Sequence, residues 1–150
     1  MTGVISLIKA DHQDLEKVFV QLEEEKGDIK ALLREVAEML IPHSKAEEQV
    51  VYPAIKRLVP DEKSDVDDGI AEHHHVEETL KTLLTEDPDD PGADGLIAAM
   101  IGEVRHHVEE EENDILPEFG KAASPQQLSE LGDQFLAAKK TALAELKANG

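Results

Sequence analysis

The residues best suited to chemistry in this chain form a pattern that occurs twice. Each copy has a histidine, two adjacent glutamates beginning four residues later, and a proline after the glutamates. The first copy is His43, Glu47, Glu48, Tyr52 and Pro53, and the second, 64 residues further along, is His107, Glu111, Glu112, Leu116 and Pro117. A four-residue step puts the histidine and the first glutamate one turn apart on the same face of a helix. Imidazole nitrogens and carboxylate oxygens are both metal ligands, so the repeat predicts a metal site.

Helices must position these side chains, and five are expected. Helix formers such as Ala, Leu, Glu and Lys dominate the sequence, and clusters of Gly, Pro and Asp divide it. The expected helices span about residues 4–26, 28–59, 62–86, 93–120 and 125–148. The first four have apolar residues at steps of three and four, and no segment alternates as a strand would. Such helices with short connections favour an all-α fold, an up-down-up-down four-helix bundle over residues 1–122, with residues 123–150 adding a C-terminal packing helix to the same domain.

A histidine lies near the middle of the apolar stripe in each of the first four expected helices. These histidines are His12, His43, His73 and His107. Neighbouring residues differ by about 100° around a helix, so of the consecutive histidines at 73–75 only His73 continues its stripe. By the same rule His107, and not His106, faces inward. The other three histidines are expected either at the surface or as hydrogen-bonding partners of the ligands: His74, His75 and His106.

Seven side chains on these stripes are candidate metal ligands. They are His12, His43, Glu47, His73, Glu77, His107 and Glu111. Glu16 follows His12 by four residues but competes with Leu15 for the inward direction, so its position stays open. Glu48, Glu78 and Glu112 fall off the stripes, and for them a solvated position is favoured over hydrogen bonds to ligands.

Buried carboxylates favour a metal site over a metal-free polar core or an acidic interaction bundle. Burying a carboxylate without a partner costs several kcal/mol, and metal cations would offset that cost. Pairing with protonated histidines would offset it too, but does not explain the repeated spacing. Six to eight nitrogen and oxygen donors exceed the needs of one tetrahedral zinc and suit two metals bridged by carboxylates. The mixed donor set suits iron, with manganese and zinc as lesser options.

Composition excludes several other functions. The net charge of −19, from 34 acidic and 15 basic residues, argues against nucleic acid and anionic membranes as partners. The chain has no cysteine, which excludes disulfides, iron–sulfur clusters and thiolate zinc sites. It also has no phosphate-binding glycine-rich loop and no Ser–His–Asp order. Lys9 and Asp11 argue against a secretory signal and no apolar run approaches a membrane span, so a cytoplasmic location is the default expectation.

With these residues in place, the chain resembles a hemerythrin-like (HHE cation-binding) domain over about residues 4–120. The motifs behind the likeness are Asp11-His12, His43 with Glu47-Glu48, Tyr52-Pro53, Glu72-His73, His107 with Glu111-Glu112, and Leu116-Pro117. The resemblance implies a four-helix bundle around two non-haem irons joined by an oxo or hydroxo bridge, with a fifth helix as in some members. It further implies that Glu47 and Glu111 bridge the irons and that His12 and His43 serve one of them. The ligands implied for the other iron are His73, His107 and Glu77.

The sequence departs from the resemblance at Glu77, where oxygen-carrying hemerythrins have a fifth histidine. An anionic carboxylate should favour the ferric state, which argues against reversible oxygen carriage. The implied function is binding or sensing of O2, NO or related small ligands. The alternatives are a redox enzyme that consumes peroxide or oxidises iron, or an iron buffer without turnover, so enzymatic activity is left open. If Glu16 turns away, the iron served by His12 and His43 keeps an open coordination position, and if Glu16 binds, that position closes.

Overall fold

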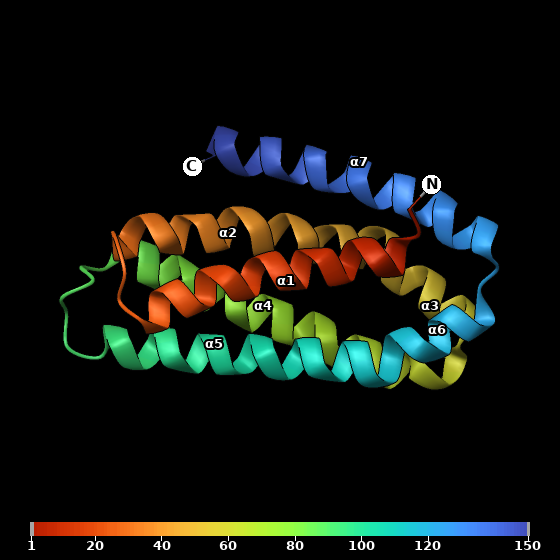
Figure 1. Ribbon diagram of the computed structural model, residues 1–150, viewed down its shortest axis with the longest axis horizontal. Helices are drawn as coiled ribbons and strands as arrows, with labels where there is room; N and C mark the ends of the chain where they lie inside the picture. The colour runs from red at the N-terminus through yellow and green to blue at the C-terminus, as the bar shows by residue number, and fades with distance from the viewer. Residues whose placement is uncertain (1, 150) are drawn as a thin grey trace.

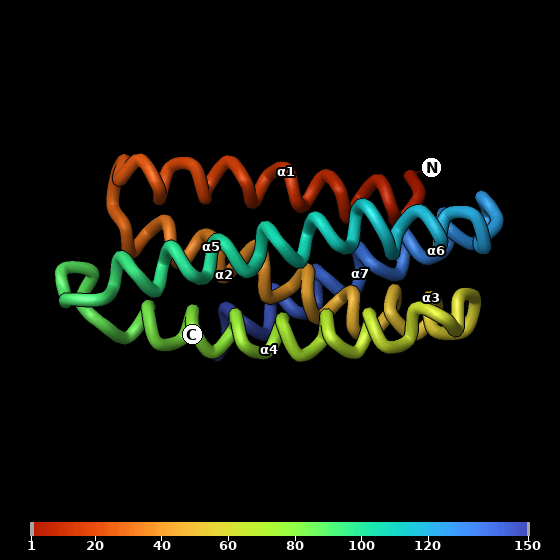
Figure 2. Tube along the Cα trace, turned by 90° about the horizontal axis from the view of Figure 1, so that it is seen from below, coloured from red at the N-terminus to blue at the C-terminus, as the bar shows by residue number. Residues whose placement is uncertain are grey.

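Helices make up all the regular structure of residues 2–149, the part of the chain that the computed structural model describes. Four long helices lie side by side in alternating directions (Figure 1): α1 (Val4–Glu23), α2 (Ile29–Ala46), α4 (Lys63–Thr85) and α5 (Ala93–Glu110). A further helix, α7 (Pro125–Asn149), packs on the outside of α1 and α2, and the view from below in Figure 2 shows it behind α4 and α5. The predicted all-α, up-down-up-down bundle with an additional C-terminal helix is confirmed. No helix within residues 2–149 is long and apolar enough to cross a membrane.

The turn between α1 and α2 depends on a glycine and an aspartate. Gly27 has a φ of 86°, in the left-handed region that favours glycine. Asp28 then caps α2, since its carboxylate accepts a hydrogen bond from the N–H of Ala31 at 3.3 Å. The cap fixes the start of the helix that bears His43.

Each copy of the repeat contains a π-helical turn where a continuous α-helix is expected. In the first copy, η1 (Glu47–Val51) leads into α3 (Tyr52–Leu58), and a short 3-10 turn, η2 (Pro60–Glu62), joins α3 to α4. In the second copy, η3 (Glu111–Ile115) leads into α6 (Leu116–Ala122). Pro53 and Pro117 explain the change, because a proline lacks an N–H and its ring clashes with the carbonyl four residues earlier. The wider turn relieves that clash. Such turns are frequent at functional sites, and here each begins at the first glutamate of the repeat.

The core consists of two apolar clusters with a polar layer between them. One cluster packs α1, α2, α4 and α5 around residues such as Phe19 and Leu33. The other lies toward α3, α6 and α7 and includes Ile8, Phe119 and Phe135. Along each long helix and its continuation, the inward histidine lies between residues of the two clusters. The apolar residues therefore shield the histidine layer from water on both sides.

Close packing of α7 on the start of α1 depends on Gly132. A Cβ at position 132 would lie 2.6 Å from the backbone oxygen of Thr2, a distance that real Cβ atoms do not show. We expect Gly132→Ala to lower the free energy of unfolding by about 1–3 kcal/mol, because α7 must shift to relieve the clash. Gly102→Ala is the matched control, since Gly102 is exposed within α5 and has open space around its Cβ. That change should stabilise the protein by up to about 1 kcal/mol. Urea unfolding measures both, and equal stability of the two variants would contradict the packing role.

Candidate metal centre

Six of the seven predicted ligands lie in two buried groups in the middle of the bundle. The first group is His12, His43 and Glu111, and the second group is Glu47, His73 and His107. Within each group, one ligand atom from every residue lies within 4.8 Å of the others. All six side chains are buried, and the two glutamates are 0% exposed. Because four helices and both π-helical turns supply them, the donors assemble only in the folded chain.

Each buried glutamate contacts histidines of both groups. Oε1 of Glu47 lies 3.1 Å from Nε2 of His43 and 3.4 Å from Nε2 of His73. The carboxylate of Glu111 lies 3.2 Å from Nε2 of His107 and 3.5 Å from Nε2 of His12. Carboxylates that reach both groups are suited to bridge two cations.

A carboxylate outside the two groups holds the other ring nitrogen of every inward histidine. The Nδ1 atoms of His12, His43, His73 and His107 bond to Glu112 at 2.6 Å, Asp11 at 2.7 Å, Glu48 at 3.2 Å and Glu72 at 2.8 Å, respectively. With Nδ1–H donating to a carboxylate, the lone pair of Nε2 faces the centre, where a cation would accept it. Asp11 and Glu72, which each precede an inward histidine, bond to a histidine in their own half of the bundle. Glu48 and Glu112, which each follow a buried glutamate, bond to a histidine in the other half.

The solvated position expected for Glu48 and Glu112 is wrong. Their side chains are 21% and 33% exposed, and each bonds to a histidine of a neighbouring helix. The residue after an inward glutamate points about 100° to the side, which in a bundle is where the next helix lies. Glu78 is 74% exposed, as expected. The structure thus assigns Glu48 and Glu112 to orienting the imidazoles.

We expect Glu112→Ala to weaken metal binding about 10- to 100-fold, because His12 loses the partner that fixes its ring and raises its basicity. Glu109→Ala removes the same charge from an exposed position in the same run of acids, so affinity should stay within about twofold. Competition against a coloured chelator measures both variants. Equal losses would mean that net charge, and not the hydrogen bond to His12, controls affinity.

The hydroxyl of Tyr52 lies inside the second group, although helical spacing does not indicate it as a ligand. It donates to Oε2 of Glu111 at 2.8 Å. It also lies 3.4 Å from Nε2 of His73 and 3.4 Å from Nε2 of His107. Burial raises the pKa of Tyr52 well above its usual range, and the charges of Glu47 and Glu111 raise it further. The phenol oxygen is therefore a further donor in the centre. It keeps its proton beside these carboxylates unless a cation replaces that proton.

The π-helical turn puts Tyr52 in this position. Its backbone N–H bonds to the carbonyl of Glu47, five residues earlier, so the two side chains lie on the same face. A regular α-helix would bring residue 51 over residue 47 instead. The signal in the sequence was the mismatch in the repeat, in which Tyr52 stands opposite Leu116.

Ion pairs balance the charges of the side chains in the centre. Burial lowers the pKa of His43, but the negative charges of Glu47 and Asp11 outweigh it and raise the pKa to about 10. Burial likewise opposes neighbouring carboxylates at His73 and His107, whose pKa values rise to about 9. A cation that binds these imidazoles must displace their protons, so binding releases protons.

Two features show that these residues fit a metal. Oε2 of Glu47 and Oε1 of Glu111 are buried without a hydrogen-bond partner among the described residues. Leaving such an oxygen unsatisfied costs about 1–3 kcal/mol, more when it is charged, and a cation would remove that cost. On α4, a Cβ at Gly69 would lie 3.1 Å from Cε1 of His107 and 3.4 Å from the Tyr52 hydroxyl. Glycine at this position therefore leaves room for the donors to approach one another.

Glu77 joins neither group, so the structure does not support its assignment as a ligand. Val76 is the residue of this turn that faces the core, at 5% exposure. Glu77 is half-buried beside Glu48 and Lys45, where burial and the charge of Glu48 raise its pKa. Steps of three and of four from His73 both lead toward the interior, and the neighbouring helices select the step of three.

The structure also defines where the side chains of Glu16 and of the other three histidines point. Glu16 turns away from the centre and binds Arg105 of α5, with Oε1 2.6 Å and Oε2 3.1 Å from the guanidinium nitrogens. Of the two positions open to the other histidines, the structure places them at the surface, with side chains 64–65% exposed: His74, His75 and His106.

Comparison with known proteins agrees with this geometry. The family model of the hemerythrin HHE cation binding domain matches residues 3–119. The chain therefore belongs to this family, and it is a cation-binding helical domain. A search of curated proteins found no match. A crystal structure of a hemerythrin HHE cation binding domain-containing protein from Mycobacterium kansasii, described as the Rv2633c homolog, is similar with a TM-score of 0.81 at 22% identity, covering 97% of this chain and 90% of that chain. The shared fold thus extends over α7 as well.

Proposed function

We propose that this protein holds two non-haem iron ions and binds a small ligand such as O2, NO or peroxide at the ion served by His12 and His43. Imidazole and carboxylate donors together suit iron better than they suit calcium or magnesium, with manganese and zinc as alternatives. Six donors in two adjacent groups, with each buried glutamate in contact with both, support a pair of ions bridged by Glu47 and Glu111 and by an oxo or hydroxo group. Iron would supply the redox capacity that such ligands require.

The observation behind this proposal is the unequal surroundings of the two groups. In the second group the hydroxyl of Tyr52 lies within 3.4 Å of Nε2 of both histidines. Beside the first group, Glu16 is the further donor that the sequence suggested, and it is bound to Arg105 at 2.6 Å. An ion served by His12 and His43 therefore keeps a coordination position for a ligand from outside.

Tyr52 favours a second candidate function, a redox enzyme that consumes peroxide or oxidises ferrous iron. A phenol oxygen that loses its proton to bind iron is a hard, anionic donor and stabilises the ferric state. Reversible oxygen carriage needs a stable ferrous pair, so this donor argues against it. Glu77 would have the same effect as a ligand, and the position of the Tyr52 hydroxyl 2.8 Å from Glu111 supports Tyr52 as the anionic donor.

Metal analysis and a visible spectrum of protein from iron-replete cells test the proposal, followed by anaerobic reduction and titration with O2, NO and peroxide. Two irons per chain and a new spectrum with O2 or NO would support ligand binding. Rapid return to the ferric form with loss of peroxide would support the redox enzyme. Zinc alone, or no metal, would contradict both.

Tyr52→Phe provides the matched control, because it removes the hydroxyl and keeps the ring. If the phenol oxygen binds iron, the variant should lose the visible charge-transfer band from phenolate to ferric iron. Its iron should also become easier to reduce. An unchanged spectrum and potential would remove the argument for the redox enzyme and leave ligand binding as the proposal.

A further inference from the structure

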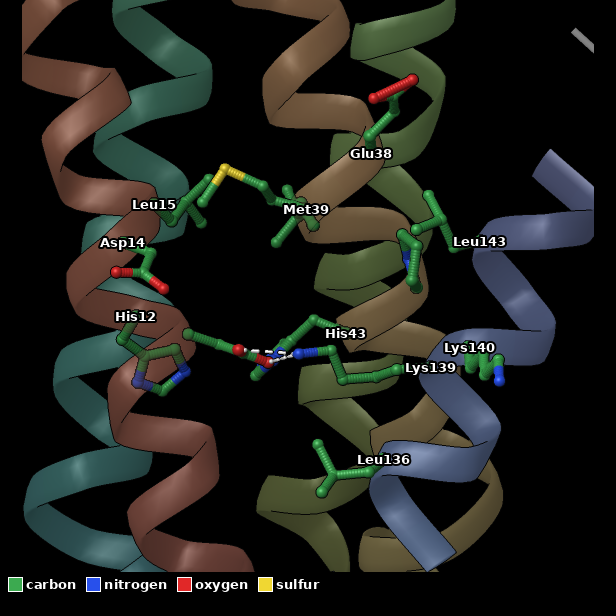
Figure 3. A pocket seen from close by; sticks show the side chains of 13 residues that line it. His12, Asp14, Leu15, Glu38, Met39, His43, Leu136, Lys139, Lys140 and Leu143 are labelled. Carbon is green, nitrogen blue, oxygen red and sulfur yellow. Dashed lines mark hydrogen bonds and ion pairs between the residues drawn. The ribbon is translucent and has the colours of Figure 1, made fainter. Parts of the chain in front are cut away.

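A cavity beneath α7 reaches the histidines of the first group. It has a volume of about 410 Å³ and is lined by residues of α1, α2 and α7 (Figure 3). His12 and His43 belong to its wall, opposite Leu136 and Leu143 of α7. This volume exceeds by a wide margin what a diatomic ligand needs.

Most of the surface area of the wall is apolar, and its charged groups are of both signs. The apolar residues are Leu15, Met39, Leu40, Pro42, Leu136 and Leu143. The charged residues are Asp11, Asp14, Glu38, Lys139 and Lys140. The wall thus carries three carboxylates and two lysines, which makes it much less negative than the chain as a whole, whose net charge is −19.

Lys139 neutralises the carboxylate closest to His43. Its Nζ lies 2.8 Å from both carboxylate oxygens of Asp11, whose Oδ2 accepts a hydrogen bond from Nδ1 of His43 at 2.7 Å. Figure 3 shows Lys139 extending from α7 toward His43. The side chains of Lys139 and Asp11 are 26% and 22% exposed, so solvent screens the pair only in part. Among the four carboxylates that hold the inward histidines, Asp11 has a lysine partner in the described part of the chain, and no such partner is seen for the other three.

We propose that this cavity is the entrance through which ligands reach the first group, and that Lys139 keeps it open to small monoanions by cancelling the charge of Asp11. The ligands it admits are small neutral molecules and monoanions, for which NO and azide serve as probes. The inference rests on the proposed function, since it requires a ligand that exchanges at the ion served by His12 and His43. It makes α7 part of the functional site, where the sequence alone predicts a packing helix.

A smaller cavity between α1 and α5 is the rival entrance. Its volume is about 210 Å³, and it touches His12 but not His43. Arg105 and Glu16 both line it, and the ion pair between them joins its two sides. A test must therefore block each cavity separately.

Because the chain has no cysteine, a thiol-reactive label attaches only to an introduced cysteine and can block either cavity selectively. Leu136→Cys puts the thiol at a 49% exposed position of the larger cavity. Gln13→Cys puts it at an exposed position of the smaller cavity. Each iron-loaded variant is compared before and after reaction with N-phenylmaleimide, and azide association is followed by stopped-flow absorption. We expect the label at position 136 to slow association at least about tenfold, and the label at position 13 to change it less than about twofold.

The outcomes separate this inference from the proposed function. Slower association with the label at position 13 alone would assign the entrance to the smaller cavity and overturn the inference. No effect of either label would also overturn it, provided that the unlabelled protein binds azide or NO. If the unlabelled protein binds neither probe, the proposed function itself fails. Metal content and melting temperature check each labelled protein, and Leu143→Cys, on the same cavity wall, replaces Leu136→Cys if that label releases metal.

The role of Lys139 is tested with Lys139→Met against Lys140→Met, an exposed lysine of the same cavity wall. We expect Lys139→Met to raise the Kd for azide about tenfold, because the charge of Asp11 is then uncompensated, and to leave NO affinity within about twofold. Lys140→Met should leave both affinities within about twofold. Equal losses for azide and NO in Lys139→Met would mean that Lys139 acts on the metal through His43. That result, or an unchanged Kd for azide, would overturn the charge role.

Discussion

Replacing His107 with alanine is expected to remove at least half of the bound metal, whereas replacing its neighbour His106 should leave metal content unchanged. Nε2 of His107 lies 3.2 Å from Glu111 and 3.1 Å from Nε2 of His73, so it points into the second group. The side chain of His106 is 65% exposed and contacts Glu110. Without one of its imidazoles, the second group should bind metal about 100-fold more weakly or worse.

Metal analysis after gel filtration, with circular dichroism to check the fold, measures this prediction. His107→Gln is a second variant of similar size, in case alanine at a buried position prevents folding. His43→Ala tests the first group in the same way, because Nε2 of His43 points into the centre, 3.1 Å from Oε1 of Glu47. Equal metal loss in His106→Ala and His107→Ala would refute the assignment of inward and outward histidines.

Removing the metal with a chelator is expected to lower the melting temperature by roughly 10 °C or more. The donors come from four helices and meet only in the folded chain, so bound metal stabilises the folded state alone. At a free concentration 1,000 times the Kd, one site contributes about 4 kcal/mol. For a domain of this size, 1 kcal/mol corresponds to roughly 2–4 °C in Tm.

Differential scanning calorimetry before chelation, after chelation and after metal is restored measures this shift. The double variant Glu47→Gln/Glu111→Gln is the control, because it keeps the shape of both buried side chains and removes their charges. Its melting temperature should not respond to the chelator. A wild-type protein that melts at the same temperature with and without metal would contradict a centre that joins four helices.

Helical periodicity explains why much of the site could be identified from the sequence. The rotation of about 100° per residue determines which of several adjacent residues shares a face with the apolar stripe. This angle is a local property of the helix, so it selected His73 from three consecutive histidines and His107 from two without knowledge of the packing. The four-residue step to Glu47 and Glu111 was equally local. The same periodicity, with the positions of Gly and Pro, was enough to predict four bundle helices and a fifth.

Local periodicity was insufficient where a contact depended on the neighbouring helix. The buried face of a helix is several residues wide, so the sequence could not decide between Val76 and Glu77, and packing placed the smaller apolar residue inside. The residues that orient the imidazoles, such as Glu112, face the sides of their helices, and their partners are identified only by which helix lies next to them.

Spacing along a regular helix is therefore sufficient to predict the helices, the two repeated histidine–glutamate pairs and a mixed set of imidazole and carboxylate donors. The tertiary structure decided which further groups reach the centre. Tyr52 enters it through a change of helical register at Glu47, which a uniform periodicity does not contain. Lys139 reaches Asp11 across 128 residues of chain, and only the packing of α7 on α1 and α2 makes that distance short.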